Sequence, residues 1–174
     1  MIRVLVTGMS GTGKSSVLAE LERRGHKVID TDYGDWAEEI TSTDGSSLEH
    51  LWREDRMDTL LAQDHAGYLF VAGCVSNQGK FYDRFDVVIL LSAPTEVLLE
   101  RIAARTTNAF GKNPAERERI LQDLDAVEPL LRATATIEIT TTPSITHVTD
   151  AVEAAARNPQ PPRPGQIHEP RSAI

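Results

Sequence analysis

The sequence predicts an α/β fold in three layers: a five-stranded parallel sheet with helices on both faces. Three observations lead to this expectation. Short apolar segments alternate with segments of helical periodicity along most of the 174 residues. One apolar segment, 87–91, is apolar at every position, which is typical of a strand covered on both faces. A glycine-rich loop joins the first expected strand to the first expected helix.

The first half of the chain is expected to contain three strands and two helices. Residues 2–6 form a short apolar run rich in β-branched side chains, which favours a strand. A helix is expected at 15–24, where apolar residues recur at helical spacing and Gly25 follows as a stop signal. The further segments expected are a strand at 27–29, a helix at 47–63 and a strand at 68–73.

The second half of the chain continues the alternation. Pro94 stands where the first turn of a helix is expected, a position that tolerates proline. The expected order of the five strands in the sheet is 2-3-1-4-5. The segments expected here are strands at 87–91 and 136–140 and helices at 94–105, 116–131 and 144–157.

The sequence predicts one domain with a short lid and a tail. Residues 1–157 carry all the periodic segments, and the lid is expected at about 106–116, which is polar and marked by Gly, Asn and Pro. From 158 to 174, five of 17 residues are proline, so we expect a flexible tail without a core.

Composition and charge exclude several classes of protein. The net charge of −8, from 18 basic and 26 acidic side chains, argues against general nucleic-acid binding, although a local basic loop can still bind a small anion. No apolar run approaches the roughly 18 residues of a membrane span, and the first residues do not resemble a signal peptide. A single cysteine, Cys74, excludes a disulfide framework. We expect a cytoplasmic monomer or homodimer without membrane or nucleic-acid partners.

In parallel sheets of this kind, ligands bind beyond the carboxyl ends of the strands. The loops that reach this edge are 7–15, 30–36, 73–84, 92–95 and 140–143.

The first of these loops carries a phosphate-binding motif. Residues 8–15 read G-M-S-G-T-G-K-S, which is the Walker A pattern G-x-x-x-x-G-K-S in its strand-loop-helix context. Glycines let successive backbone N–H groups face one anion, and the helix N-terminus adds partial positive charge. Lys14 can reach the β- and γ-phosphates of ATP, and Ser15 can ligate Mg²⁺. The residues expected to bind the nucleotide here are Gly8, Ser10, Gly11, Thr12, Gly13, Lys14, Ser15 and Ser16.

Two absences narrow the class of nucleotide-binding protein. The chain has no N-K-x-D run, which GTPases use for guanine, and its third strand runs into Gly73 and Cys74 instead of ending in Asp. Together with the small size, these absences favour a small-molecule or nucleotide kinase.

A pair of carboxylates follows the second expected strand. Residues 28–32 read V-I-D-T-D, so Asp30 and Asp32 stand two apart at a strand end. One carboxylate could hold water on Mg²⁺ while the other accepts a hydroxyl proton. The alternative is an acidic strand end exposed to solvent.

With this D-x-D pair and the loop, residues 2 to about 157 resemble the shikimate kinase and nucleoside monophosphate kinase branch of the P-loop kinases. The resemblance implies that Asp30 serves the metal side, with Ser15, and that Asp32 contacts the acceptor. It also implies ATP and Mg²⁺ as cofactors.

Two further segments carry the resemblance. Residues 99–105, L-E-R-I-A-A-R, resemble the D-R-I-x-x-R run before the lid of adenylate-kinase-type enzymes. The resemblance implies that Arg101 packs on adenine and that Arg105 reaches the phosphates. The two are i, i+4 and share a helix face, although pairing on the surface with Glu96 or Glu100 is the alternative.

The third segment, 106–119, occupies the lid position. A lid excludes water and brings cations onto the transferring phosphoryl group. The candidate cations are Lys112, Arg117 and Arg119, and the sequence leaves open which of them acts.

The sequence also departs from shikimate kinases. Val127 stands where those enzymes have an arginine for the shikimate carboxylate, and their glycine run is reduced to Gly73 followed by Cys74. Arg53 does resemble an acceptor-site arginine, the alternative being surface pairing with Glu54 or Asp55. The acceptor contacts are therefore expected to be Asp32, Arg53 and Gly73, and the acceptor is expected not to be shikimate.

The sequence thus predicts an ATP- and Mg²⁺-dependent kinase that moves the γ-phosphate to a hydroxyl of a small molecule. Its catalytic residues are expected to be Lys14, Asp32 and Arg105. The alternatives are a nucleoside or nucleotide kinase, or a nucleotide-binding assembly or regulatory ATPase.

Overall fold

A parallel five-stranded sheet forms the centre of the computed structural model, which describes residues 1–41, 48–64, 66–106 and 111–159. Neighbouring strands pair in parallel throughout this sheet, in the order β2-β5-β1-β6-β7. The expected α/β class is confirmed. The strands are β1 (Ile2–Thr7), β2 (Lys27–Asp30), β5 (Tyr68–Ala72), β6 (Val87–Ser92) and β7 (Ile137–Thr140).

The labels of this order differ from the expected 2-3-1-4-5 because the chain contains two strands that the sequence did not predict. β3 (Ala37–Thr41) and β4 (Leu48–Trp52) pair antiparallel as a separate two-stranded sheet. Counted without them, the five strands of the main sheet lie in the order expected.

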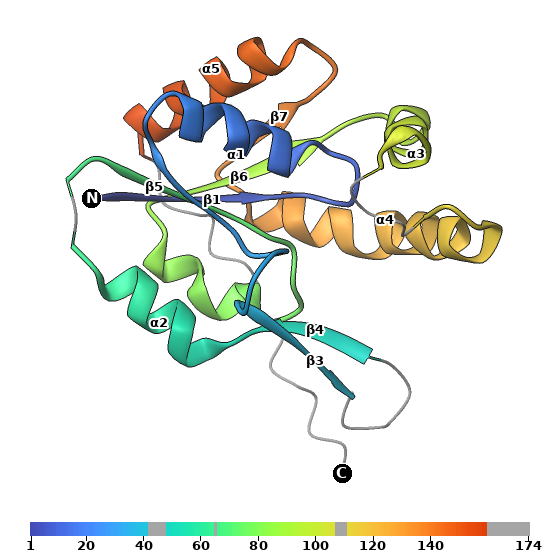
Figure 1. Cartoon of the computed structure of the whole chain (residues 1–174), viewed down its shortest axis with the longest axis horizontal. Helices are drawn as coiled ribbons and strands as arrows, with labels where there is room; N and C mark the ends of the chain where they lie inside the picture. The colour runs from blue at the N-terminus through green and yellow to red at the C-terminus, as the bar shows by residue number, and fades with distance from the viewer. Residues whose placement is uncertain (42–47, 65, 107–110, 160–174) are drawn as a thin grey trace.

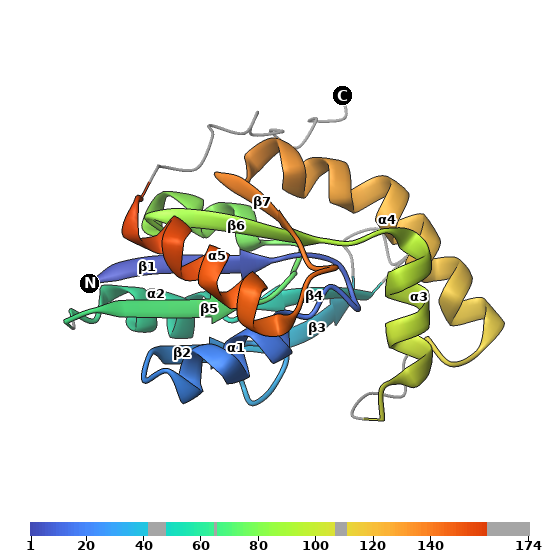
Figure 2. The same ribbon diagram turned by 90° about the horizontal axis from the view of Figure 1, so that it is seen from above.

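Helices cover both faces of the sheet, as Figures 1 and 2 show. α1 and α5 pack together on one face, and α2, the 3₁₀-helix η1 and α4 lie on the other, while α3 stands at one end. The bounds are α1 (Lys14–Arg23), α2 (Glu54–Ala62), η1 (Gln78–Arg84), α3 (Thr95–Ala104), α4 (Pro114–Thr134) and α5 (Ile145–Arg157).

Alternate strand residues feed two hydrophobic cores. Leu5 of β1 faces the α2 and α4 side, where it joins Met57 and Leu131. Its neighbour Val6 faces the opposite side and packs with α1 and α5, through residues such as Leu18. All of β6 is buried, as its uninterrupted apolar sequence predicts.

The expected helix at 47–63 is wrong in its first part. Residues 48–52 form strand β4, and the helix begins only at Glu54. The apolar residues here have helical spacing, but tertiary contacts override it. Trp52 pairs across the hairpin with Ala37, and its backbone N–H and C=O both hydrogen-bond to the Asn77 side chain, each at 2.9 Å. Part of the expected loop 73–84 is likewise helical, as η1.

Both ends of the lid segment are described. α3 ends at Ala104, and α4 begins at Pro114, two residues before the expected start. Asn113 caps α4 by accepting a hydrogen bond from the Glu116 N–H at 2.9 Å. The central lid residues 107–110, and residues 160–174 of the expected tail, lie outside the described part.

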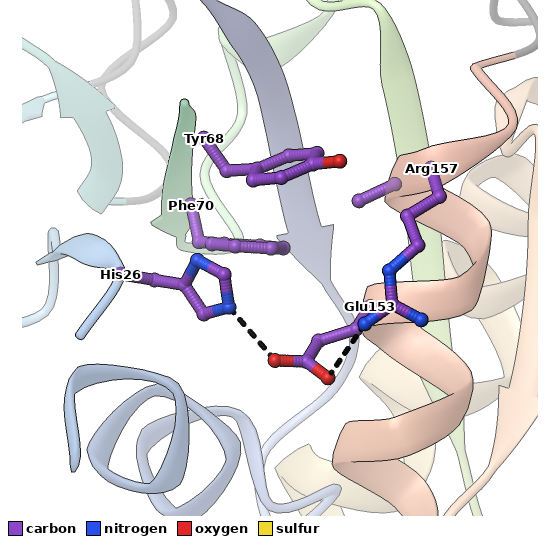
Figure 3. A pocket seen from close by; sticks show the side chains of 6 residues that line it. His26, Tyr68, Phe70, Glu153 and Arg157 are labelled. Carbon is purple, nitrogen blue, oxygen red and sulfur yellow. Dashed lines mark hydrogen bonds and ion pairs between the residues drawn. The ribbon is translucent and has the colours of Figure 1, made fainter. Parts of the chain in front are cut away.

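The turn between α1 and β2 is tied to α5 by charged side chains and to β5 by aromatic ones (Figure 3). His26 Nε2 lies 2.7 Å from Glu153 Oε1, and Arg24 Nη1 lies 3.1 Å from Glu153 Oε2. The His26 ring contacts Tyr68 and Phe70 edge-on, with centroids 5.6 and 5.2 Å apart. The cavity among these side chains is about 30 Å³, which is enough for water but too small for an organic ligand, so we assign this cluster a structural role.

None of the helices in the described ranges is long and apolar enough to span a bilayer.

Candidate nucleotide and acceptor site

A cavity of about 870 Å³ opens beside the phosphate loop. Its walls come from the ends and loops of four elements that are distant in sequence. The first wall is residues 10–17, from the loop and the start of α1, and the second is Asp32 and Tyr33 after β2. The third comes from the end of α3 and the residue after it, and the fourth from the segment after β7; their residues are Arg101, Ala104 and Arg105, and Thr141, Pro143, Ile145 and Val148. This position agrees with the expectation that ligands bind beyond the carboxyl ends of the strands.

The loop is held tightly against the sheet. Gly8 has φ +148°, and a Cβ at this position would lie 2.4 Å from the Leu91 carbonyl oxygen, so no other residue fits here without a shift. Thr12 donates its hydroxyl hydrogen to the Met9 carbonyl at 2.8 Å. α1 begins directly after Gly13, which places the helix N-terminus at the cavity wall.

The Lys14 amine is held inside the loop. Its Nζ donates to the carbonyl oxygens of Gly8 and Met9, at 2.7 and 3.3 Å, and the residue is only 8% exposed. Ser15 and Ser16 follow at the cavity wall with exposed side chains. The motif thus brings an ammonium, a helix N-terminus and two hydroxyls together at one wall of the cavity, a set of groups that suits an anion.

Arg101 of α3 and Arg105, which follows this helix, both reach the phosphate loop, and no ion pair with Glu96 or Glu100 is found among the described residues. Arg101 donates to the Thr141 hydroxyl at 2.9 Å and to the Thr141 carbonyl at 2.6 Å, and it reaches the Gly11 carbonyl at 3.4 Å. Arg105 donates to the Ser10 hydroxyl at 3.3 Å. Arg101 therefore links α3, the loop and the segment after β7.

Thr141 is a site residue that the sequence did not single out. It is 5% exposed, and with Pro143, Ile145 and Val148 it forms a partly apolar wall of the cavity. Only its position could have indicated this wall from the sequence, because residues 140–143 form one of the loops expected at the carboxyl ends of the strands. Its residue types carry no motif.

The two carboxylates after β2 have different surroundings. Asp30 is half-buried, and its Oδ1 accepts the Asp32 N–H at 3.1 Å, which turns the chain after the strand. Asp32 is exposed and lines the cavity, whereas Asp30 does not. Between them, Thr31 is buried and donates to the Ala72 carbonyl at 2.7 Å.

The side-chain oxygens near the loop suit a magnesium ion that is also bound by phosphates. Among the described residues, no three His, Cys, Asp or Glu side chains converge on one point. Mg²⁺ usually takes only one or two protein oxygens and completes its shell with phosphates and water. Ser15 with one of the two aspartates would supply such a set.

Gly73 supports the hairpin and does not line the cavity. A Cβ on Gly73 would lie 2.3 Å from Thr31 Oγ1 and 3.0 Å from the Trp52 ring. Trp52 is 1% exposed, and its Nε1 donates to that same hydroxyl at 2.8 Å. The close approach of these three residues fixes β4 against the sheet.

Arg53 also lies outside the cavity wall and is paired with acids. Its Nη2 lies 3.2 Å from Asp35 and 3.9 Å from Glu38. Arg56 Nη1 lies 2.9 Å from the other oxygen of Asp35, and its guanidinium stands 4.8 Å from the centroid of the Trp36 ring. The partner of both arginines is thus Asp35, which precedes the hairpin, instead of the adjacent Glu54 or Asp55.

Two of the lid cations make backbone contacts. Lys112 Nζ donates to the carbonyls of Ile102, Ala103 and Arg105, at 2.9, 2.6 and 2.6 Å, and so caps the end of α3. Arg117 donates to the Gly111 carbonyl at 3.2 Å. Arg119 is exposed on α4.

Cys74 stands next to the phosphate loop. Burial raises the pKa of its thiol, with Lys14 acting in the opposite direction. The thiol stays protonated at neutral pH, which suits a packing residue better than a nucleophile.

This geometry defines a nucleotide-binding protein of the P-loop class. The model of the AAA domain family matches residues 4–122, more than half of the chain, and the chain belongs to this family.

Known relatives and structures narrow the class. A protein of Archaeoglobus fulgidus named "Putative adenylate kinase" is 32% identical over 162 residues, covering 88% of this chain and 82% of the relative. The solved shikimate kinase of Acinetobacter baumannii in complex with shikimate aligns with a TM-score of 0.61 at 19% identity, over 91% of this chain and 94% of that one. A gluconokinase of Sinorhizobium meliloti aligns with a TM-score of 0.58 at 18% identity, over 90% and 92%. The chain is a kinase-like P-loop protein, and the two solved structures share its fold.

Proposed function

We propose that the protein transfers the γ-phosphate of ATP to a hydroxyl group of a small molecule, with Mg²⁺ as cofactor. The observation that carries this proposal is the shared cavity, which is lined by Lys14 of the phosphate loop, Arg105 after α3 and Asp32 after β2. Cations for the phosphates and a carboxylate for the acceptor thus border one space of about 870 Å³.

ATP would lie with its phosphates at the loop and its base against the wall after β7. The backbone N–H groups of the loop and the start of α1 would bind the phosphates, and Lys14 would leave the carbonyls of Gly8 and Met9 to reach them. The Thr141 segment offers apolar contacts for the base, and Arg101 is positioned beside it by two hydrogen bonds. Mg²⁺, bound by Ser15 and an aspartate, would supply further positive charge on the phosphates.

Transfer would depend mainly on positioning and electrostatics. Lys14 and Arg105 would offset the negative charge of the γ-phosphoryl group as it leaves ADP. Asp32 would orient the attacking hydroxyl and accept its proton. Among the lid cations Lys112, Arg117 and Arg119 we assign none to the phosphates, because none of the three lines the cavity.

The acceptor is proposed not to be shikimate. Val127, which replaces the carboxylate-binding arginine of shikimate kinases, is half-buried and packs against the hydrophobic core. Arg53, the other arginine expected for an acid, is paired with Asp35. Neither position offers a free cation to a carboxylate.

A nucleotide kinase is the second candidate, and the name of the Archaeoglobus relative favours it. In that reaction a phosphate oxygen of AMP would attack instead of a hydroxyl. The product would then be a diphosphate instead of a phosphate monoester.

The test is acceptor-dependent ADP formation, measured over a panel of sugars, polyols, amino alcohols, nucleosides, shikimate and AMP. We expect a phosphate monoester in the ³¹P NMR spectrum of the product and loss of its formation in Lys14→Ala. Consumption of AMP with formation of two ADP for each ATP used, and with no new phosphate monoester, would establish the nucleotide kinase instead. ATP hydrolysis that no acceptor stimulates would contradict both kinase assignments.

A further inference from the structure

Nearly all of the protein's net negative charge comes from one segment, which begins at the proposed site. Residues 30–56 contain nine acidic and two basic side chains, so they account for a net charge of −7 of the chain's −8. The remainder of the chain is almost neutral. This segment runs from the end of β2 to the start of α2. Its residues Asp32 and Tyr33 line the cavity beside the phosphate loop.

The two basic residues of the segment are already neutralised. Asp35 bridges Arg53 and Arg56, and Arg56 also donates to the Asp35 carbonyl at 2.7 Å. Glu38 stands 3.9 Å from Arg53. An anionic acceptor would have to displace these carboxylates, whereas a cationic one would not.

At the cavity itself the segment contributes a carboxylate and an aromatic ring. Asp32 is exposed, and Tyr33 beside it is 55% exposed, and both line the cavity that holds the phosphate loop. A carboxylate with an aromatic face is a set of groups that attracts an ammonium ion.

We propose that the acceptor is a hydroxyl compound that carries a protonated amine, such as an amino sugar or amino alcohol. This inference rests on the kinase function proposed above. The acceptor oxygen would form a bond to the γ-phosphorus as the bond from phosphorus to the ADP oxygen breaks. The hydroxyl proton would pass to Asp32 and then to solvent, and the amine would remain protonated near Tyr33, where the acidic segment borders the cavity.

The experiment compares acceptors that differ mainly in charge. D-Glucosamine, D-glucose and D-gluconate form one matched series, to which a wider set of amino alcohols, polyols and hydroxy acids, with shikimate and AMP, is added. We expect kcat/KM for ADP formation to be about tenfold or more higher for the cationic class than for the neutral one, and lowest for the anionic class. The KM of the cationic acceptors should rise with ionic strength, because salt screens the attraction.

Variants test whether the segment is the cause. In Asp35→Asn, Arg53 and Arg56 lose a shared carboxylate, so kcat/KM for cationic acceptors should fall about three- to tenfold while that for anionic acceptors rises. Glu22→Gln, which removes one acid from the exposed side of α1, should change neither class.

The outcomes separate the two proposals. A preference for AMP, shikimate or gluconate, or equal rates for the three charge classes, would overturn the inference while leaving the kinase intact. The same holds if Asp35→Asn and Glu22→Gln behave alike. Absence of acceptor-dependent ADP formation in every class would overturn the proposed function and the inference with it.

Discussion

Single residues set the geometry on both sides of the cavity. Lys14 and the glycines of the loop were readable from the sequence, because the motif requires those residue types at that spacing. The roles of Asp35 and Thr141 could not be predicted, because both depend on tertiary contacts. Asp35 pairs with two arginines, and Thr141 accepts hydrogen bonds from Arg101. The packing role of Gly73 was not predicted for the same reason: its lack of a side chain lets Thr31 and Trp52 approach closely.

Gly73→Ala should destabilise the protein by about 1–3 kcal/mol, the usual cost of overpacking a close contact. The added methyl would lie 2.3 Å from the Thr31 hydroxyl, which two hydrogen bonds hold in place. Urea unfolding measures the change. Gly79→Ala is the matched control, because a Cβ there meets no atom within 4 Å. Equal stability of the two variants would contradict the packing role of Gly73.

Asp32→Asn and Asp30→Asn should have different effects. Asp32→Asn should lower kcat by roughly 10²-fold with little change in ATP affinity, because the proposed base is lost. Asp30→Asn should raise the Mg²⁺ concentration needed for activity. Acceptor kinetics and Mg²⁺ titrations check both. If Asp32→Asn weakens MgATP binding as much as Asp30→Asn does, the division of labour between them is wrong.

Among the secondary-structure elements, the five strands of the main sheet could be predicted from the sequence, whereas the β3–β4 hairpin could not. The central strands β1, β5 and β6 are largely buried and read as mostly apolar runs, whereas the edge strands β2 and β7 are partly exposed. The residues of β4 have helical spacing, and they form a strand because they pair with β3 and because Asn77 binds the Trp52 backbone. Asn77 is 25 residues away in sequence, beyond the reach of any local pattern.

The cap on α3 gives a prediction for the element that carries Arg101 and Arg105. Lys112→Met removes an ammonium from three carbonyls at the end of the helix, which should cost about 0.5–1 kcal/mol of stability. Lys112 also holds the backbone of Arg105, the proposed phosphate ligand, so the KM for ATP should rise in Lys112→Met. Lys112→Arg, which keeps a positive charge, should have a KM between those of Lys112→Met and the unmodified protein. Lys80→Met, at an exposed lysine of η1, is the control. Identical behaviour of the two methionine variants would exclude this role for Lys112.

The junction between α1 and α5 predicts acid sensitivity. The hydrogen bond from His26, with the Arg24 charge, holds the pKa of Glu153 below its ordinary 4.5. Hydrogen bonds from Arg23 and Arg24 lower the pKa of Glu20 to about 2. A carboxyl whose pKa is lower in the folded state contributes stability above pH 4.5 that is lost as the pH falls toward 2.

Glu153→Gln should therefore have a lower Tm than the unmodified protein at pH 7, and the difference should shrink below pH 4.5. Thermal unfolding followed by circular dichroism across this range measures it. Glu22→Gln, on the exposed side of α1, should follow the unmodified protein at every pH. A difference that grows on acidification would have the wrong sign for this network.

At the scale of the whole molecule, the sheet gathers charges of opposite sign on two sides of one cavity. The loop of β1 and the arginines of α3 form a cationic side, and the segment after β2 forms an acidic side. The strand order brings these sides together, because β5 alone separates β2 from β1. On the proposed function, this arrangement would give the phosphates of ATP and a cationic acceptor complementary surroundings.

Titration of MgATP into the protein, followed by calorimetry, tests the central claim that this cavity binds a nucleotide through Lys14. We expect one binding site in the unmodified protein and in Lys27→Ala, whose exposed lysine lies on β2 away from the cavity. Lys14→Ala should retain its fold and bind about tenfold or more weakly, the scale for losing charge-assisted hydrogen bonds. No binding by the unmodified protein, or equal binding by the two variants, would contradict the account.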